Sequence, residues 1–246
     1  MAHAHTAGVN VPHDANEGHH YTSTGLDNRK IAIWAFIGSE CMLFASLIST
    51  YMIYKGRSLV GPYPHQWWCK ATNATAPLEA TGIAGCPAGE LYKPILDIPV
   101  TSASTFVLLM SSLFMVLALA AVQTKNDPRP ANMGTWAKAL RSSKLWLLMT
   151  ALFGTIFLGF QAYEFTAFVN EGLSIRTNLF GSSFFTLTGF HGAHVTAGVI
   201  WLMTLFFIDV KRGLGPDDAL IVDLSALYWP FVDVVWIAIF TLVYLI

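Results

Sequence analysis

Long apolar stretches recur along the chain, separated by shorter polar segments. Each stretch is long enough to cross a bilayer, since a transmembrane helix needs about 20 apolar residues. The predicted spans are residues 31–54, 98–122, 145–168, 181–208 and 226–246. The pattern therefore predicts an all-α integral membrane protein, built as a five-helix transmembrane bundle.

The polar segments define the domain organisation. Residues 1–28 contain no Lys or Arg and no apolar core, which is typical of a disordered polar tail rather than a secretory signal. Five of the eight histidines lie in this tail, where metal buffering is the alternative to a solvated segment. Residues 29–246 are expected to form a single transmembrane domain, with a long loop over 55–97.

Composition supports a membrane protein. The chain is 54% hydrophobic and 12% charged, whereas soluble domains have about 25% charged residues. Five spans occupy about half of the chain, so a separate soluble catalytic domain is excluded. The net charge of -1 gives no indication of nucleic-acid binding.

The distribution of basic residues predicts the orientation. With the N-terminus inside, the inner segments carry nine Lys and Arg residues and the outer segments carry five. Because cytoplasmic loops are enriched in Lys and Arg, we expect the N-terminus inside and the C-terminus outside. The loop 55–97 is then outside, where Cys69 and Cys86 either form a disulfide or remain two free thiols. Cys41, inside the first span, is expected to be a small packing residue.

Several polar side chains fall within the spans, where they are costly. Glu40 is either a functional residue linked to protons, lipid or gas, or an acid hydrogen-bonded to a neighbouring helix. Asp233 lies at a similar depth, so the two acids either share a polar seam or make unrelated packing bonds, which we favour. Gln161 and Glu164 are three residues apart on one helix face, so we expect them to bond together to neighbouring helices.

The fourth span carries two histidines, His191 and His194, among small residues that favour close helix packing. Both are candidate metal or haem ligands. However, Glu-x-x-His pairs typical of di-iron bundles are absent, and no other span has a histidine. An interhelical hydrogen bond or a lipid headgroup contact is therefore the favoured interpretation, and no metal site is predicted.

Four motifs resemble one family. WAFIGSECMLFASL in the first span, GFQAYEF in the third, GFHGAHVTAGVIW in the fourth and YWPFVDVVW in the fifth are similar to subunit III of haem–copper terminal oxidases. The resemblance covers about residues 30–246, in the same order and spacing. The chain looks like the short, five-span bacterial form, a multi-pass protein of the inner membrane.

The resemblance implies a non-catalytic subunit of a proton-pumping cytochrome c oxidase. Such a subunit carries no haem or copper; these are expected in partner subunits. It packs on the catalytic subunit I, associates with subunit II and other subunits, binds phospholipid and is expected to guide oxygen. The implied lipid and oxygen cleft involves Glu40, His194 and Lys211, with Arg212 added by proximity, whereas His191, Gln161, Glu164 and Asp233 are interhelical polar residues.

Other functions remain open at this stage. Subunit III of a quinol oxidase and the related accessory protein of nitric oxide reductase belong to the same superfamily, and a stand-alone transporter is a more distant alternative. The sequence also departs from the family at three places. Pro230 stands where the family commonly has His, Asp223 where it commonly has Glu, and the long outer loop with two cysteines is not expected.

Overall fold

The computed structural model describes residues 27–59, 61–72, 75–76, 86–87, 91–126 and 142–246. The predicted tail therefore lies almost entirely outside the described residues. Within the described part of the chain, five helices are long and apolar enough to cross a membrane. They are α1 (Asn28–Tyr54), α2 (Ile98–Gln123), α4 (Ser143–Asn170), α5 (Leu179–Arg212) and α6 (Ala219–Phe240). The prediction of an all-α transmembrane bundle is confirmed.

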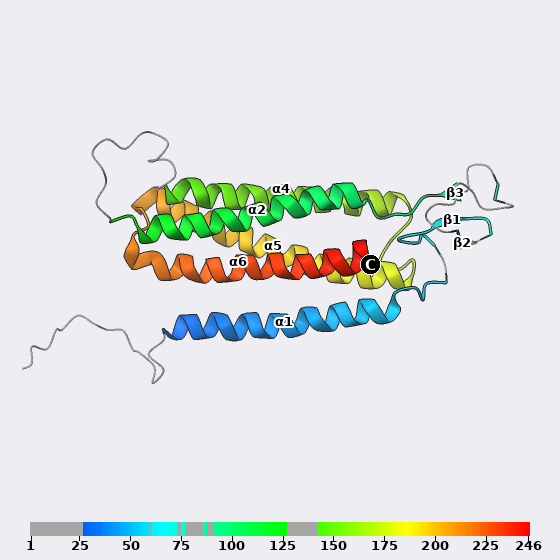
Figure 1. The fold of residues 1–246 in the computed structure, drawn as a ribbon, viewed down its shortest axis with the longest axis horizontal. Coiled ribbons are helices and arrows are strands. Elements are labelled where there is room, and N and C mark those ends of the chain that lie inside the picture. Colours follow the sequence, from blue (N-terminus) through cyan, green and yellow to red (C-terminus); the bar gives the residue numbers. More distant parts are fainter. Residues whose placement is uncertain (1–26, 60, 73–74, 77–85, 88–90, 127–141) are drawn as a thin grey trace, which may run out of the picture.

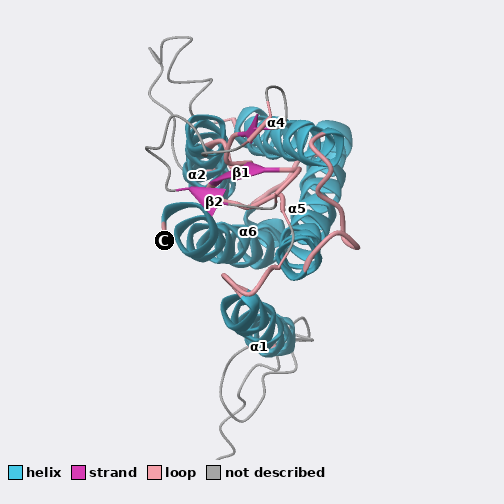
Figure 2. Ribbon diagram, turned by 90° about the vertical axis from the view of Figure 1, so that its right-hand side faces the viewer, coloured by secondary structure: helices cyan, strands magenta, loops and turns pink. Residues whose placement is uncertain are grey.

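Four of these helices form the main bundle and the fifth lies beside it (Figures 1 and 2). Helix α2 packs against α4 and α6, α4 packs against α5, and α5 packs against α6. Helix α1 packs against α5 and α6 from outside this group. In its most apolar 18-residue stretch only 6% of the residues are buried, against 28% to 44% in the other spans. Most of α1 therefore faces lipid or a partner.

The helix ends follow from local sequence. The Asp27 side chain accepts a hydrogen bond from the Arg29 amide at 2.8 Å and caps α1. Asp97 caps α2, whose second residue is Pro99, and Asn178 caps α5. Such side chains satisfy amides that the first helical turn leaves without partners. Helix α5 ends at Arg212 and is followed by Gly213, whose φ of +75° is accessible to glycine at little cost.

The last span differs from its prediction. The helix begins at Ala219 rather than at 226, so the segment that contains Asp223 is part of the helix. Helix α6 also runs without interruption through Pro230 and passes into a π-helical turn, Thr241–Leu245. The Asp223 carboxylate is accommodated by an ion pair with the Lys30 ammonium, at 2.6 Å.

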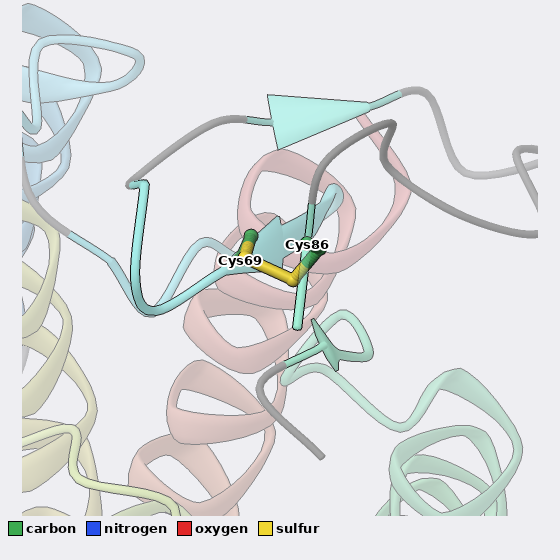
Figure 3. Close-up of a disulfide and its surroundings, with 2 residues drawn as sticks. All are labelled: Cys69 and Cys86. Atoms are coloured by element: carbon green, nitrogen blue, oxygen red, sulfur yellow. A yellow bond between two sulfur atoms is a disulfide. The ribbon is translucent and has the colours of Figure 1, made fainter. Parts of the chain in front are cut away.

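The loop between α1 and α2, which we call the cap (the described parts of 55–97), contains a small sheet that the sequence did not predict. Strand β1 (Trp67–Cys69) pairs antiparallel with β2 (Thr75–Ala76) and β3 (Leu91–Tyr92). A disulfide joins Cys69 in β1 to Cys86 (Figure 3). The cap lies at the end of the bundle where α1 finishes (Figure 1).

The core of the main bundle is centred on Trp229 of α6, which is fully enclosed. Its indole lies against Gly154 of α4 and Gly198 of α5, where an added Cβ would come within 2.6 and 2.8 Å of the ring. Its Nε1–H donates to Ser111 Oγ of α2 at 2.8 Å. Small residues thus admit one large ring that contacts three helices, a common solution where helices pack within lipid.

Candidate functional site

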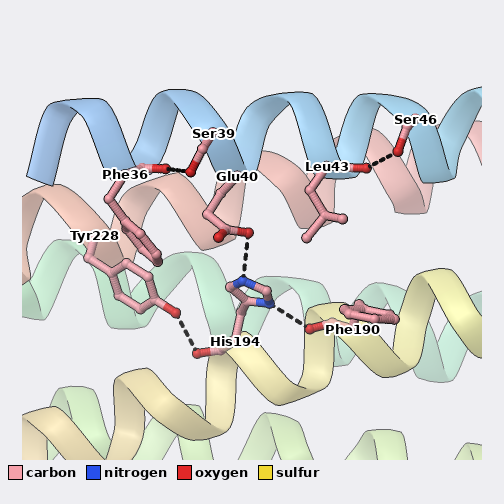
Figure 4. Close-up of polar contacts among 8 residues, drawn as sticks. All are labelled: Phe36, Ser39, Glu40, Leu43, Ser46, Phe190, His194 and Tyr228. Atoms are coloured by element: carbon pink, nitrogen blue, oxygen red, sulfur yellow. Dashed lines mark hydrogen bonds and ion pairs between the residues drawn. The ribbon is translucent and has the colours of Figure 1, made fainter.

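The candidate site is a pair of side chains between α1 and α5. Glu40 Oε2 lies 3.0 Å from His194 Nε2 (Figure 4). Each residue sits near the middle of its helix, and each side chain retains 16% exposure. The pair is therefore near the membrane centre but not sealed inside the main bundle. Sequence reasoning placed both residues in one cleft but did not predict this contact.

Hydrogen bonding fixes how many protons the pair holds. His194 Nδ1 lies 2.8 Å from the Phe190 carbonyl oxygen, which only accepts, so Nδ1 carries a hydrogen. Nε2 then faces Glu40 with one proton shared between them, held either by the carboxyl or by the imidazole. In both forms the pair is neutral overall, which suits its depth in the membrane.

Neighbouring aromatic side chains hold the pair in place. Phe44 lies one helical turn beyond Glu40 on α1, and its ring centroid is 5.0 Å from that of His194. The Tyr228 hydroxyl of α6 donates to the His194 backbone oxygen at 3.0 Å (Figure 4). The spacing of Glu40 and Phe44 puts both on the face of α1 that meets α5. Three helices thus converge on one titratable pair.

His191 behaves differently from the expectation of an interhelical hydrogen bond. It is fully buried, and neither ring nitrogen has a hydrogen-bond partner among the described residues. Its ring stacks on Trp236 with a centroid distance of 4.9 Å and meets the edge of Phe157 at 5.9 Å. The expectation failed because the facing positions are aromatic rather than polar.

Two other buried acids, Glu164 and Asp233, bond to hydroxyl groups of α2, on what we call the α2 polar face (Thr101, Thr105, Ser111 and Ser112). A third, Asp209 of α5, accepts from Ser143 of α4 instead. Glu164 is 3% exposed; it accepts a hydrogen bond from Thr101 Oγ1 and one from Gln161 Nε2 at 3.1 Å. Gln161 and Glu164 therefore act together toward a neighbouring helix, as their spacing suggested.

Asp233 of α6 bonds to a second position on this face. Ser112 Oγ donates to its Oδ2 at 2.5 Å, and the Trp236 indole of the same helix donates to Thr105 at 2.9 Å. Asp233 and Glu40 thus have different partners on different helices, rather than lining a common seam. The α2 polar face bonds α2 to α4 and α6, a packing role for these acids.

The remaining candidates lie at the helix ends. Arg212 pairs with Asp218 at 2.8 Å, and Lys211 is exposed beside it at the end of α5. His194 is more than four helical turns from both residues, so the structure does not bring it to the headgroup region with them. The lipid-contact set expected from the sequence therefore divides into a mid-membrane pair and a basic helix end.

The cap ties α1 to the C-terminal turn. Lys55 Nζ donates to the Leu242 oxygen at 3.4 Å, and His65 Nε2 lies 3.1 Å from the Val243 oxygen. Burial and the nearby Lys55 ammonium lower the pKa of His65, and its bond to the Val243 oxygen opposes that decrease. Because the Val243 oxygen only accepts, Nε2 of His65 carries a hydrogen and donates it.

Among the described residues, no three His, Cys, Asp or Glu side chains converge as a metal site requires. The geometry defines a class: a multi-pass helical membrane protein with a carboxyl–imidazole pair inside the bilayer. The cytochrome c oxidase subunit III family model matches residues 65–246. The chain belongs to this family, the subunit III of haem–copper oxidases.

Similar proteins occur in bacterial oxidases of two kinds. Cytochrome c oxidase subunit 3 of Bacillus sp. strain PS3 is 36% identical over 89% of this chain and 86% of its own length. Probable quinol oxidase subunit 3 of Staphylococcus saprophyticus is 31% identical over 96% of this chain and 97% of its own. Quinol oxidase subunit 3 of Bacillus subtilis is 30% identical over 100% of this chain and 97% of its own length. The chain is a multi-pass protein of the bacterial inner membrane and part of a respiratory oxidase.

Proposed function

We propose that this chain is the non-catalytic subunit III of a proton-pumping cytochrome c oxidase. Oxygen is reduced in the neighbouring catalytic subunit, where haem and copper are expected, and this chain stabilises that subunit, binds phospholipid and guides oxygen. The observation that supports this role most directly is the Glu40–His194 pair, a titratable group held between α1 and the main bundle.

The setting of the pair suits a role in proton balance. Because one proton is shared, the pair can move charge between the carboxyl and the imidazole without changing the total in the membrane. A purely structural acid needs only a hydroxyl partner, as Asp233 has in Ser112. The choice of a histidine partner at a partly exposed position therefore favours function over packing.

The space between α1 and α5 supports lipid and oxygen binding. A pocket of about 230 Å³ lies between their cap-side halves, lined by Leu47, Thr50, Leu179, Ser182 and Thr186 among others. Oxygen is apolar, so a lipid-filled cleft concentrates it relative to water. At the opposite end of α5, Lys211 and Arg212 are exposed basic residues that a lipid headgroup can reach, and Arg212 also pairs with Asp218.

We also propose that the N-terminus lies in the cytoplasm and the cap outside. The excess of Lys and Arg on the α1 N-terminal side supports this orientation. The disulfide within the cap supports it independently, since disulfides persist in oxidising compartments.

A quinol oxidase is the second candidate, because two similar proteins carry that name and match nearly the whole chain. The accessory protein of nitric oxide reductase and a stand-alone transporter remain the more distant alternatives. Purifying the complex and identifying its other chains separates these functions. A copper-binding subunit II establishes cytochrome c as donor, its absence beside a catalytic subunit I supports quinol, and purification of this chain alone would argue against an oxidase.

Glu40→Gln in the assembled oxidase tests the role of the pair. We expect slower turnover at limiting oxygen with normal turnover at saturating oxygen. The control is Ser39→Ala, an exposed neighbour whose hydroxyl bonds only to its own helix at Phe36. Unchanged oxygen dependence and unchanged stability over many cycles would reduce Glu40 to a packing residue.

A further inference from the structure

Side chains from four parts of the chain bring oxygen atoms together just below the cap. Glu164, near the end of α4, contacts Thr101 in the first turn of α2 and Gln161 on its own helix. Tyr244, in the π-helical turn after α6, approaches the Thr101 hydroxyl and interacts electrostatically with Glu164 and with Tyr51 of α1. We call this group the cap-side junction. All of its members are at most 6% exposed, so the junction is closed to bulk solvent.

Three polar atoms of the junction have no hydrogen-bond partner among the described residues. They are Tyr51 Oη, Tyr244 Oη and Gln161 Oε1. Gln161 Oε1 shares its amide group with Nε2, which donates to Glu164 at 3.1 Å, so this oxygen also lies beside the acid. Folded proteins rarely leave buried polar atoms unpaired. Three such atoms in one place therefore indicate a partner that the chain itself does not supply.

Ring contacts support the placement of both tyrosines at the same end of the bundle. The Tyr51 ring centroid is 6.2 Å from that of Phe180, and the Tyr244 centroid is 6.3 Å from that of Phe184. Phe180 and Phe184 stack on each other along α5 at 5.5 Å. Tyr51 and Tyr244 thus approach from α1 and from the C-terminal turn over two adjoining rings, and each carries its hydroxyl into the interior unpaired.

The unpaired atoms match the hydrogen-bonding capacity of water. Each tyrosine hydroxyl offers a hydrogen, and the Gln161 oxygen needs one. A water molecule accepts two hydrogen bonds and donates two, and buried waters make about three. An apolar molecule such as oxygen would satisfy none of the three atoms. The junction holds a single carboxyl group, and no metal-binding cluster occurs among the described residues.

Water also has a route to the junction. Glu164 lines a pocket of about 520 Å³ formed by the cap, the start of α2 and the end of α4. The opposite side of the same carboxyl group faces Thr101 and Gln161. The acid therefore separates solvent on the cap side from the unpaired atoms, and a small local opening is sufficient for a water molecule to enter.

We propose that the cap-side junction binds a buried water molecule held by Tyr51 Oη, Tyr244 Oη and Gln161 Oε1. This water joins α1 to α4 and to the C-terminal turn, although these three side chains make no direct bond to one another. Glu40 lies three helical turns away from Tyr51 along α1. The water site is therefore independent of the Glu40–His194 pair, and it holds or fails separately from the proposed function.

X-ray footprinting of the purified oxidase complex tests for this water. Hydroxyl radicals that form from a bound water oxidise the side chains beside it, even where bulk solvent has no access. We expect oxidation of Tyr51 and Tyr244, which are 0% and 1% exposed. Trp229 is the control, because it is equally buried but its Nε1–H is already paired with Ser111. Absence of oxidation at both tyrosines, or equal oxidation of Trp229, would overturn the proposal.

Two variants test whether the tyrosines share one water. Tyr244→Phe should lower the oxidation of Tyr51 about fivefold, because the water loses a hydrogen-bond partner. Tyr51→Phe should lower the oxidation of Tyr244 by a similar factor. Tyr54→Phe, at an exposed position one turn farther along α1, should change neither. Unchanged oxidation of the remaining tyrosine in both variants would contradict a shared water.

A high-resolution cryo-electron microscopy map of the same complex gives the position of the water. We expect a density peak within about 2.6–3.2 Å of all three unpaired atoms. The peak should not change when rubidium replaces sodium in the buffer. A direct bond between the Tyr51 and Tyr244 hydroxyls with no peak would show a dry contact, and a peak that strengthens with rubidium would show a cation. Either result would overturn the proposal.

Discussion

Helix α1 and the main bundle bury their acids in different ways. In the main bundle Asp233 and Glu164 receive hydroxyl hydrogen bonds from the α2 polar face and are 3% exposed. On α1, which has few buried residues, Glu40 contacts a histidine, and both side chains remain partly exposed. A hydroxyl partner keeps its own proton, whereas an imidazole nitrogen can either hold or give up the proton that it shares with a carboxyl group. The first arrangement suits packing and the second suits proton exchange.

The contacts that hold α1 also differ from those that hold the main bundle together. Among the described residues, the polar anchors of α1 include Lys30–Asp223 near one end, Glu40–His194 in the middle and the cap contacts of Lys55 and His65 at the other end. The main bundle instead depends on enclosed rings such as Trp229. We therefore expect the bundle and α1 to respond differently to equivalent substitutions.

Trp229→Ala should have the largest effect on stability. It empties the space between Gly154, Gly198 and Ser111, and large-to-small changes of this kind cost about 3–5 kcal/mol. Trp34→Ala is the matched control, because Trp34 is 61% exposed on α1. Thermal unfolding of the purified complex measures both. Similar losses for the two variants would contradict the contrast between α1 and the main bundle.

Cys69→Ser should loosen the cap and leave the bundle folded. A disulfide that closes a loop of this length, a sequence separation of 17, contributes about 3 kcal/mol. Because the cap also holds the end of α1, hydrogen exchange should rise in the cap and in the last turns of α1. Cys41→Ser, at an exposed α1 position, is the control. Faster exchange in α2 and α4 instead would show that the cap stabilises the whole bundle.

Ser112→Ala removes the hydroxyl partner of Asp233 and should cost about 0.6–1.7 kcal/mol, the average and the maximum found for hydrogen bonds between helices within a membrane protein. Ser46→Ala on α1, whose hydroxyl bonds to its own helix at Leu43, should cost less. Chemical denaturation of both variants gives the difference. Turnover should be normal in both, and an oxygen-dependent defect in Ser112→Ala would assign function to Asp233 as well.

The smallest effect concerns pH at the cap. Because the folded state lowers the pKa of His65 below its usual 6.5, the unfolded state binds the proton more readily. The contribution of this contact is complete above about pH 6.5 and declines as pH falls, by at most about 1.4 kcal/mol per pH unit. Hydrogen exchange of the cap between pH 5 and 8 should show this trend. His65→Gln should remove it, and a trend of opposite sign would contradict the assigned cause.

Sequence periodicity was sufficient for the architecture, because bilayer thickness and backbone hydrogen bonding leave few alternatives to a helix for a long apolar segment. Periodicity was less informative about where each helix begins and ends. The segment 219–225 was placed outside the last span, although it belongs to α6. Its one charged residue, Asp223, pairs with Lys30, a contact that the sequence alone does not reveal. The cap strands are two or three residues long, too short for any periodic signal.

The site was harder to predict than the fold. Glu40 and His194 were both selected, yet their contact depends on α1 lying against α5 rather than elsewhere on the bundle. A usable signal existed, since each residue lies near the middle of its span and the two helices are antiparallel neighbours. His191 was predicted to hydrogen-bond because imidazole is polar, but its ring packs as an aromatic group against Trp236.

The central claim is that Glu40 and His194 act as one proton-sharing unit in a respiratory oxidase. The most direct measurement is a double-mutant cycle of Glu40→Gln, His194→Gln and the double variant, following the loss of activity per turnover in the assembled oxidase. We predict that each single variant shortens the active lifetime, that the double variant is no worse than the more affected single one, and that the chain remains bound throughout. Unchanged lifetimes with the chain bound, or losses that simply add, would contradict the claim.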